Sequence, residues 1–222
     1  MLRCSLLLLV VTIVTFACEE RPAHTASVPE PQSVAADTRP VILAFGDSLT
    51  AGHGVELSDS YPSQLQRELD KRGYRYRVVN AGISGDTTSG GLSRIDAALA
   101  VHPRIVILEL GANDGLRGLP VAESKRNLEQ MIVKSQNAGA KVILAGMTLP
   151  LNYGPDYIHD FQSMFPDLAK QHHTILIPFF LEGVAAHMDL NQEDGIHPTA
   201  KGYVILTQLV LKYLEPLLTK TP

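Results

Sequence analysis

Five short apolar runs, separated by segments with helical patterning, constrain the fold of this chain more than any other feature. The runs cover residues 41–45, 75–80, 105–110, 141–145 and 174–178. Strands that are apolar on both faces and alternate with helices are typical of a parallel sheet covered on both sides. Right-handed crossovers leave few topologies for such a sheet. We therefore predict an α/β fold, a three-layer α/β/α sandwich with a five-stranded parallel sheet in flavodoxin-like order.

The intervening segments show the spacing of amphipathic helices. Ser60 can cap a helix that runs to about residue 72, in which Leu65 and Leu69 lie four residues apart on one face. Further helices are expected to end near residue 100, to cover residues 123–138, to end near residue 171 and to cover residues 202–218.

Polar loops follow the first three predicted strands. They contain residues 47–48, residues 84–86 and residues 113–114. Because the carboxyl ends of parallel strands meet at one edge of the sheet, these loops are expected to converge there, and ligands of open α/β sheets bind at that edge.

The residues of these loops, with a pair near the C-terminus, match the needs of acyl transfer. Ser48 is a weak nucleophile until an imidazole accepts its proton. Asp194 and His197 lie three residues apart, so the carboxylate can orient the ring. The backbone N–H of Ser48, Gly85 and the side-chain amide of Asn113 are candidate donors to the oxyanion.

Four sequence blocks then resemble the SGNH, or GDSL-type, serine hydrolase family. They are residues 46–49 (Gly-Asp-Ser-Leu), 80–87, 111–114 and 194–198, and they occur in the family's order. The resemblance implies Ser48, Asp194 and His197 as the catalytic triad. It also implies an oxyanion hole formed by Ser48, Gly85 and Asn113, with no metal and no cofactor.

Shorter stretches between the blocks resemble one subgroup, the bacterial thioesterase I / protease I / lysophospholipase (arylesterase) enzymes. These stretches are residues 113–118, 149–154 and 178–180. The likeness implies a periplasmic hydrolase of acyl esters or thioesters that works through an acyl-Ser48 intermediate. Two alternatives are a carbohydrate O-deacetylase or acyltransferase using the same triad, and a catalytically inactive lipid-binding lipoprotein.

The loop after the fourth predicted strand supplies candidate substrate-binding residues. Four of its side chains can line an acyl groove or, equally, pack the loop against the domain. They are Leu149, Pro150, Leu151 and Tyr153.

Other polar residues are expected to have structural or solvent-facing roles. Asp47 and Asp86 are expected to accept hydrogen bonds from loop backbone, and Asp114 to stay at a helix start. The other histidines of the predicted domain are expected to face solvent, which leaves no metal site; they are His53, His102, His159, His172, His173 and His187.

The first 39 residues have the pattern that is typical of a targeting segment followed by a tether. Residues 1–18 combine Arg3 with an apolar run at residues 6–16, which is shorter than the roughly 20 residues of a membrane-spanning helix. Residues 15–18 resemble a lipobox, with Cys18 as the lipidated residue. Residues 19–39 have the composition of a disordered tether, and residues 40–222 form the hydrolase domain. An exported protein, periplasmic or membrane-anchored, is expected.

Charge and cysteine usage exclude other classes. The net charge of −4 comes without a basic stretch, so a nucleic-acid partner is not expected. Both cysteines, Cys4 and Cys18, precede the domain, which therefore has no disulfide. A monomer with a small-molecule acyl ester or thioester substrate, tethered to a membrane if Cys18 carries a lipid, is the expected state.

Overall fold

A parallel sheet of five strands forms the centre of the fold in a computed structural model that describes residues 37–220. The strands are β1 (Val41–Gly46), β2 (Arg77–Gly82), β3 (Ile105–Glu109), β4 (Lys141–Ala145) and β5 (Ile175–Ile177). Their order is β2-β1-β3-β4-β5, and every neighbouring pair is parallel. The predicted α/β sandwich of flavodoxin-like order is confirmed. The predicted signal peptide, Cys18 and most of the tether lie outside the described residues.

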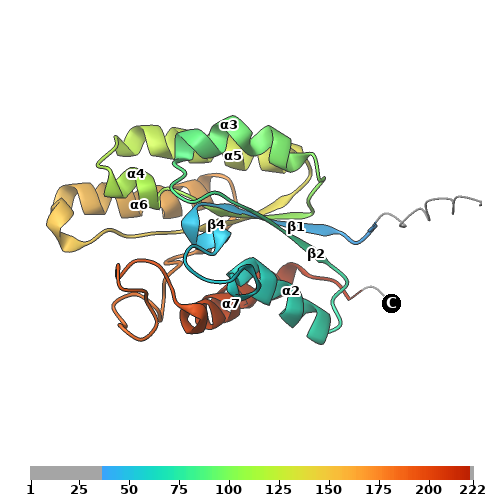
Figure 1. Ribbon diagram of the computed structural model, residues 1–222. Helices are drawn as coiled ribbons and strands as arrows, with labels where there is room; N and C mark the ends of the chain where they lie inside the picture. The colour runs from blue at the N-terminus through green and yellow to red at the C-terminus, as the bar shows by residue number, and fades with distance from the viewer. Residues whose placement is uncertain (1–36, 221–222) are drawn as a thin grey trace, which may run out of the picture. The chain divides into compact units, whose positions relative to one another are not determined.

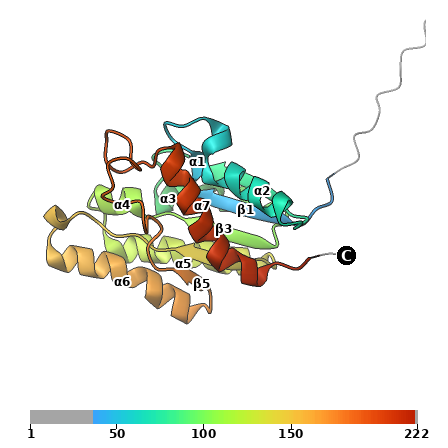
Figure 2. The ribbon, with the colours of Figure 1, turned by 90° about the horizontal axis from the view of Figure 1, so that it is seen from below.

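Helices cover both faces of this sheet (Figures 1 and 2). On one face, α2 (Tyr61–Lys71) packs beside α7 (Ala200–Leu214). On the other face lie α3 (Thr88–Leu99), α5 (Val121–Asn137) and α6 (Pro155–Gln171), packed in that order. The short helices are α1 (Ser48–Ala51) and α4 (Ala112–Leu116), and the 3-10 turns are η1 (Leu57–Asp59), η2 (Leu151–Tyr153) and η3 (Glu215–Leu217).

Burial follows the position of each strand in the sheet. All residues of β1 and β3 are buried, because both strands have neighbours on either side and helices above and below. The edge strand β2 is only partly buried along its whole length. The strand ends are level where the site lies, since Gly46 pairs with Gly82 on one side and with Glu109 on the other.

Some helix ends differ from the predicted ones. The last helix begins at Ala200, where the Thr199 side chain accepts a hydrogen bond from the N–H of Gly202, and it ends at Leu214 rather than residue 218. Pro216 has no N–H to continue the α-helical ladder, so the chain tightens into η3. Ser60 precedes α2 as predicted, but its hydroxyl donates to the carbonyl of Leu57 instead of accepting from the helix. Within residues 37–220, no helix has both the length and the apolar character that crossing a membrane requires.

Candidate active site

Ser48 is placed by the abrupt end of β1, an interior strand of the sheet. Asp47 caps α1 by accepting a hydrogen bond from the N–H of Leu49 at 3.0 Å, and Ser48 is the first residue of that helix. The turn needs a glycine at position 46, because a Cβ there would lie 2.6 Å from the carbonyl oxygen of Glu109. The nucleophile therefore stands at a helix N-terminus, where free N–H groups favour negative charge.

A continuous hydrogen-bonded chain joins Ser48 to His197 and Asp194. The Nε2 atom of His197 lies 2.9 Å from the Ser48 hydroxyl, and its Nδ1 atom lies 2.6 Å from Oδ2 of Asp194. The other carboxylate oxygen of Asp194 accepts from the backbone N–H groups of Ile196 and His197, each at 3.0 Å. This is the arrangement in which an imidazole can accept the serine proton while its tautomer is fixed from behind.

The carboxylate of Asp194 is held ionised. Desolvation raises its pKa, but the hydrogen bonds from the His197 ring and from two backbone N–H groups outweigh that effect and lower the pKa to about 2. An ionised Asp194 can stabilise the imidazolium that forms when His197 takes the proton of Ser48.

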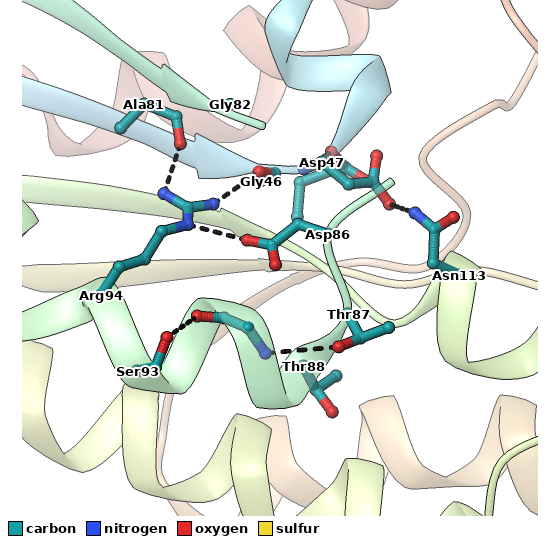
Figure 3. Close-up of polar contacts among 12 residues, drawn as sticks. Gly46, Asp47, Ala81, Gly82, Asp86, Thr87, Thr88, Ser93, Arg94 and Asn113 are labelled. Atoms are coloured by element: carbon teal, nitrogen blue, oxygen red, sulfur yellow. Dashed lines mark hydrogen bonds and ion pairs between the residues drawn. The ribbon is translucent and has the colours of Figure 1, made fainter. Parts of the chain in front are cut away.

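The three predicted oxyanion donors lie in the segments that follow β1, β2 and β3, with Ser48 in α1 and Asn113 in α4. Ser48 and Asn113 line one cavity, and the amide nitrogen of Asn113 donates to Oδ2 of Asp47 at 3.0 Å (Figure 3). Gly85 lies in the turn after β2 with a φ of +80°, and its carbonyl accepts from Arg117 at 2.9 Å. Gly85 does not belong to the cavity wall itself.

Two carboxyl groups are buried behind the nucleophile. Oε2 of Glu109, at the end of β3, accepts from the backbone N–H of Asp47 at 3.3 Å and from the Thr50 hydroxyl at 2.8 Å. Burial raises the pKa of Asp47 to about 6, although hydrogen bonds oppose the shift. Burial and the neighbouring Asp47 charge raise the pKa of Glu109 well above its usual range.

The Asp86 side chain has a different partner from the predicted one. Its carboxylate pairs with Arg94 of α3 at 2.7 Å, so the expectation that it holds loop backbone is wrong (Figure 3). The same guanidinium donates to the carbonyls of Ala81 and Gly46 and stacks on the Phe45 ring. Arg94 thereby joins the ends of β1 and β2 to the loop that contains Gly85.

Asp114 also has a longer-range role than expected. It lies inside α4, is buried, and accepts from the N–H and hydroxyl of Thr88 and from the hydroxyl of Ser124. It therefore ties the first turns of α3 and α5 to α4, the helix that contains Asn113.

An apolar cavity of about 350 Å³ opens beside the triad. Leu149 and Pro150 line it, as the sequence suggests for the loop after β4. Leu151 is 89% exposed outside the wall, and the Tyr153 hydroxyl instead donates to the carbonyl of Leu116. The other apolar lining residues come from four segments: Leu49, Ala112 with Leu116, Met147, and the C-terminal loop residues Phe179, Leu181, Ala185, Ala186 and Ile196.

One histidine departs from the solvent-facing expectation. His172 is largely covered and its Nε2 lies 3.1 Å from Glu129. His53, His102, His159, His173 and His187 are exposed as predicted. The exposed His53 also packs its ring against that of His197, with ring centroids 4.6 Å apart. Across residues 37–220, no cluster of three or more His, Cys, Asp or Glu side chains has the arrangement of a metal site.

Sequence reasoning missed Glu109, Arg94 and the C-terminal wall of the cavity. Glu109 is a charged residue at the end of a buried apolar run, and that pattern is a signal for a functional or paired carboxyl. Arg94 lies in a helix with ordinary amphipathic spacing, and the C-terminal loop has no periodicity, so neither gives such a signal.

Comparison with known proteins agrees with this geometry. The GDSL-like Lipase/Acylhydrolase family matches residues 44–205. Esterase TesA of Pseudomonas aeruginosa is 47% identical over 188 residues, which is 84% of this chain and 92% of that protein. Thioesterase 1/protease 1/lysophospholipase L1 of Escherichia coli K12 is 40% identical over 187 residues, 84% of this chain and 87% of that protein.

The fold also matches that of a solved relative. A crystal structure of TesA superposes with a TM-score of 0.77 at 47% identity, covering 80% of this chain and 99% of that one. Because the family match spans most of the chain and includes Ser48, Asn113, Asp194 and His197, this protein belongs to the GDSL-like lipase/acylhydrolase family of serine ester hydrolases.

Proposed function

We propose that this protein hydrolyses acyl esters and thioesters with apolar acyl chains through an acyl-Ser48 intermediate. The observation that carries the proposal is the chain of hydrogen bonds from Asp194 through His197 to Ser48, which opens onto an apolar cavity. The names of the relatives, an esterase and a thioesterase with lysophospholipase activity, support the same class of substrates.

The reaction proceeds in two balanced steps. The hydroxyl oxygen of Ser48 attacks the acyl carbon as His197 takes its proton, and the imidazolium returns that proton to the departing alcohol or thiol. Water then attacks the acyl-Ser48 carbonyl, again losing its proton to His197, and the carboxylic acid leaves as Ser48 is restored. The Asn113 amide and the backbone N–H groups of Ser48 and Gly85 stabilise the oxyanion in both steps.

Labelling with a fluorophosphonate tests the nucleophile. Intact-mass spectrometry of the purified wild type should show one adduct, because His197 activates a single serine. Ser48→Ala should show none, and the matched control Ser89→Ala, which removes an exposed hydroxyl on α3, should label fully. A folded wild type that takes no label would favour the inactive lipid-binding alternative.

A panel of esters with graded acyl length tests the cavity. Each methylene that enters an apolar wall contributes about 0.8 kcal/mol, so kcat/KM should rise about fourfold per methylene until the cavity is filled. Ala185 lines the cavity, so Ala185→Leu should reduce the length of the longest acyl chain that the enzyme hydrolyses. Ala97→Leu, on the exposed side of α3, should leave that length unchanged. Acetyl esters preferred over longer chains in the wild type would instead support the deacetylase alternative.

We further propose that the protein is exported and acts as a monomer, with Cys18 carrying a lipid that tethers it to a membrane. The apolar run at residues 6–16 and the lipobox-like residues 15–18 support this. Wild type expressed with labelled palmitate should fractionate with membranes and carry the label, and Cys18→Ala should carry none. If wild type and Cys18→Ala were equally soluble and neither carried the label, the tether would be contradicted. A dimeric mass in solution would contradict the monomer.

A further inference from the structure

A buried pair of carboxyl groups lies behind the nucleophile. Neither group takes part in the two steps of acyl transfer. Asp47 and Glu109 are each 1% exposed. Asp47 reaches the wall of the substrate cavity, where its carboxylate is covered and accepts a hydrogen bond from Asn113, whereas Glu109 lies behind the wall. Burying ionisable groups costs free energy that apolar side chains would not, so a specific interaction has to offset it.

Both oxygens of the Asp47 carboxylate have defined partners. Oδ1 accepts from the N–H of Leu49 at 3.0 Å and so fixes the first turn of α1, which begins with Ser48. Oδ2 accepts from Nδ2 of Asn113 at 3.0 Å (Figure 3). One side chain therefore connects the nucleophile's helix with the side-chain donor of the oxyanion hole.

The chemistry of the carboxylate decides which end of the Asn113 amide faces it. A side-chain amide has a donor end and an acceptor end of nearly equal size, and packing alone selects weakly between them. An ionised carboxylate only accepts hydrogen bonds, so only Nδ2 can face Asp47. The second N–H of Nδ2 then stays free for an oxyanion, whereas a flipped amide would turn its oxygen toward that negative charge.

Glu109 is placed to keep Asp47 the ionised member of the pair. Its Oε1 has no hydrogen-bond partner within the described part of the chain, and a buried ionised carboxylate oxygen without a donor is costly, which favours the neutral form of Glu109. Burial and the Asp47 charge raise the pKa of Glu109 well above its usual range. The interaction between the two carboxyl side chains lowers the pKa of Asp47 and raises that of Glu109, so Glu109 is the member that keeps the proton, and above about pH 6 the negative charge resides on Asp47.

The surrounding titratable groups are consistent with this assignment. The phenols of Tyr61 and Tyr203 stay neutral, because burial raises the pKa of each. Arg94 is bound to Asp86, and His197 is the one triad member whose charge acts on Asp47.

We propose that Asp47 is a positioning residue for the oxyanion hole: its carboxylate, backed by protonated Glu109, holds the Asn113 amide with Nδ2 toward the substrate oxygen. The proposal rests on the acyl-transfer function and deepens it. Asp47 is only 1% exposed in the cavity wall, so in this proposal it acts on the substrate oxygen through Asn113.

The variant Asp47→Asn separates this role from a structural one. The new amide keeps an oxygen to cap Leu49, yet its own NH₂ group meets Nδ2 of Asn113, and Asn113 flips to avoid two facing donors. Loss of one oxyanion donor lowers kcat about 10²–10³-fold with KM nearly unchanged. A kcat close to that of wild type would overturn the proposal.

A double-mutant cycle with Asn113→Ala identifies the route of the effect. If Asp47 acts through Asn113, the double variant should be about as slow as either single variant. Losses that multiply in the double variant would show that Asp47 acts independently of Asn113 and would overturn the proposal.

Glu109→Gln and Asp47→Ser complete the test. Glutamine is the neutral isostere of a protonated glutamic acid, so Glu109→Gln should keep most of the kcat at neutral pH. A loss of kcat as large as that of Asp47→Asn would refute a neutral Glu109.

Should Asp47→Asn fail to fold, Asp47→Ser still caps α1 but cannot reach Asn113, and it should show the same loss of kcat. Wild type that takes no fluorophosphonate label would instead refute the proposed function itself.

Discussion

The charge of Asp194 is set by its immediate neighbours, because two backbone N–H groups and the His197 ring donate to it and hold its pKa at about 2. Replacing it with asparagine should leave the loop in place but present the wrong group to Nδ1 of His197. We expect Asp194→Asn to lower kcat by about 10⁴-fold while KM changes little.

Steady-state kinetics on an aryl ester would measure this loss, with the exposed Asp189→Asn, five residues earlier in the same loop, as the control. Because the folded pKa of Asp194 lies below 3.8, its contribution to stability is present above that pH and is lost as the pH falls toward 2. An acid limb near neutral pH that disappeared in Asp194→Asn would contradict this assignment.

Asp47 has the opposite linkage to pH. Its folded pKa of about 6 exceeds the ordinary value of 3.8, so the folded state binds more protons than the unfolded state between these values. The contribution of Asp47 to stability is therefore full below pH 3.8 and declines as pH rises to 6. The stability of Asp47→Asn relative to wild type should rise over that interval, by roughly 2–3 kcal/mol.

Urea unfolding of both proteins at pH 4 and pH 7 gives this difference directly. The surface variant Asp96→Asn, on the exposed side of α3, serves as the control and should show little change relative to wild type. A constant difference between wild type and Asp47→Asn across the interval would mean that Asp47 titrates normally in the folded state.

At the scale of elements, α1 is held against the edge of the sheet by close backbone contact. A Cβ at Gly82, the last residue of β2, would collide with the backbone nitrogen of Ala51 and lie 2.6 Å from the carbonyl carbon of Thr50. Gly82→Ala should therefore push α1 away from β2 and displace Ser48 from His197. We expect kcat to fall at least 10²-fold, since small misplacements of reacting groups cost that much.

Gly73→Ala separates this clash from ordinary backbone strain. Gly73 has a φ of +77° but open space around its missing Cβ, so the substitution should cost about 1 kcal/mol of stability and leave kcat unchanged. Kinetics and thermal unfolding of both variants would test this, and a fully active Gly82→Ala would show that α1 can shift without moving the nucleophile.

The elements that could be predicted from the sequence are those whose signal is local. Apolar runs of five or six residues identify buried strands, and their alternation with helices leaves few topologies. The predicted end of α7 at residue 218 is wrong, because the apolar spacing continues to Leu217 whereas Pro216 lacks the N–H that the helix needs. Apolar periodicity does not report such a backbone break.

The residues of the candidate site likewise divide into those with a local sequence signal and those without one. Ser48, Asp194 and His197 stand in short motifs, so their roles could be predicted from sequence. The contact of Asp47 with Glu109 spans 62 residues and depends on the register of β1 against β3, which no local pattern specifies. The cavity wall likewise combines loops that are distant in the chain, and only Leu149 and Pro150 of the four predicted residues reach it.

At the scale of the whole molecule, the triad joins the end of β1, an interior strand of the sheet, to a segment with little regular structure. Residues 178–199 contain one isolated bridge, between Asn191 and Pro198, and the side chain of Asn191 donates to the carbonyls of Val184 and His187. Segments with few regular hydrogen bonds open at lower free energy than the sheet. In urea, esterase activity should be lost at lower concentration than the far-UV circular dichroism signal.

The two unfolding curves can be measured on the same samples. Asn191→Ala, which removes the ties inside residues 178–199, should widen the gap between the curves by moving the activity midpoint alone. Coincident midpoints in wild type and variant would show that this segment unfolds together with the sheet.

The nucleophile and its base are separated by 149 positions, so the two halves of the reactive centre leave the ribosome at opposite ends of synthesis. A growing chain exposes Ser48 early, but it has no activating imidazole until residues near 197 have been added. Every shortened product of translation or proteolysis that lacks the last few dozen residues is consequently inert toward cellular esters. Hydrolytic capacity thus requires that synthesis has passed His197, and turnover reports that this part of the chain is present.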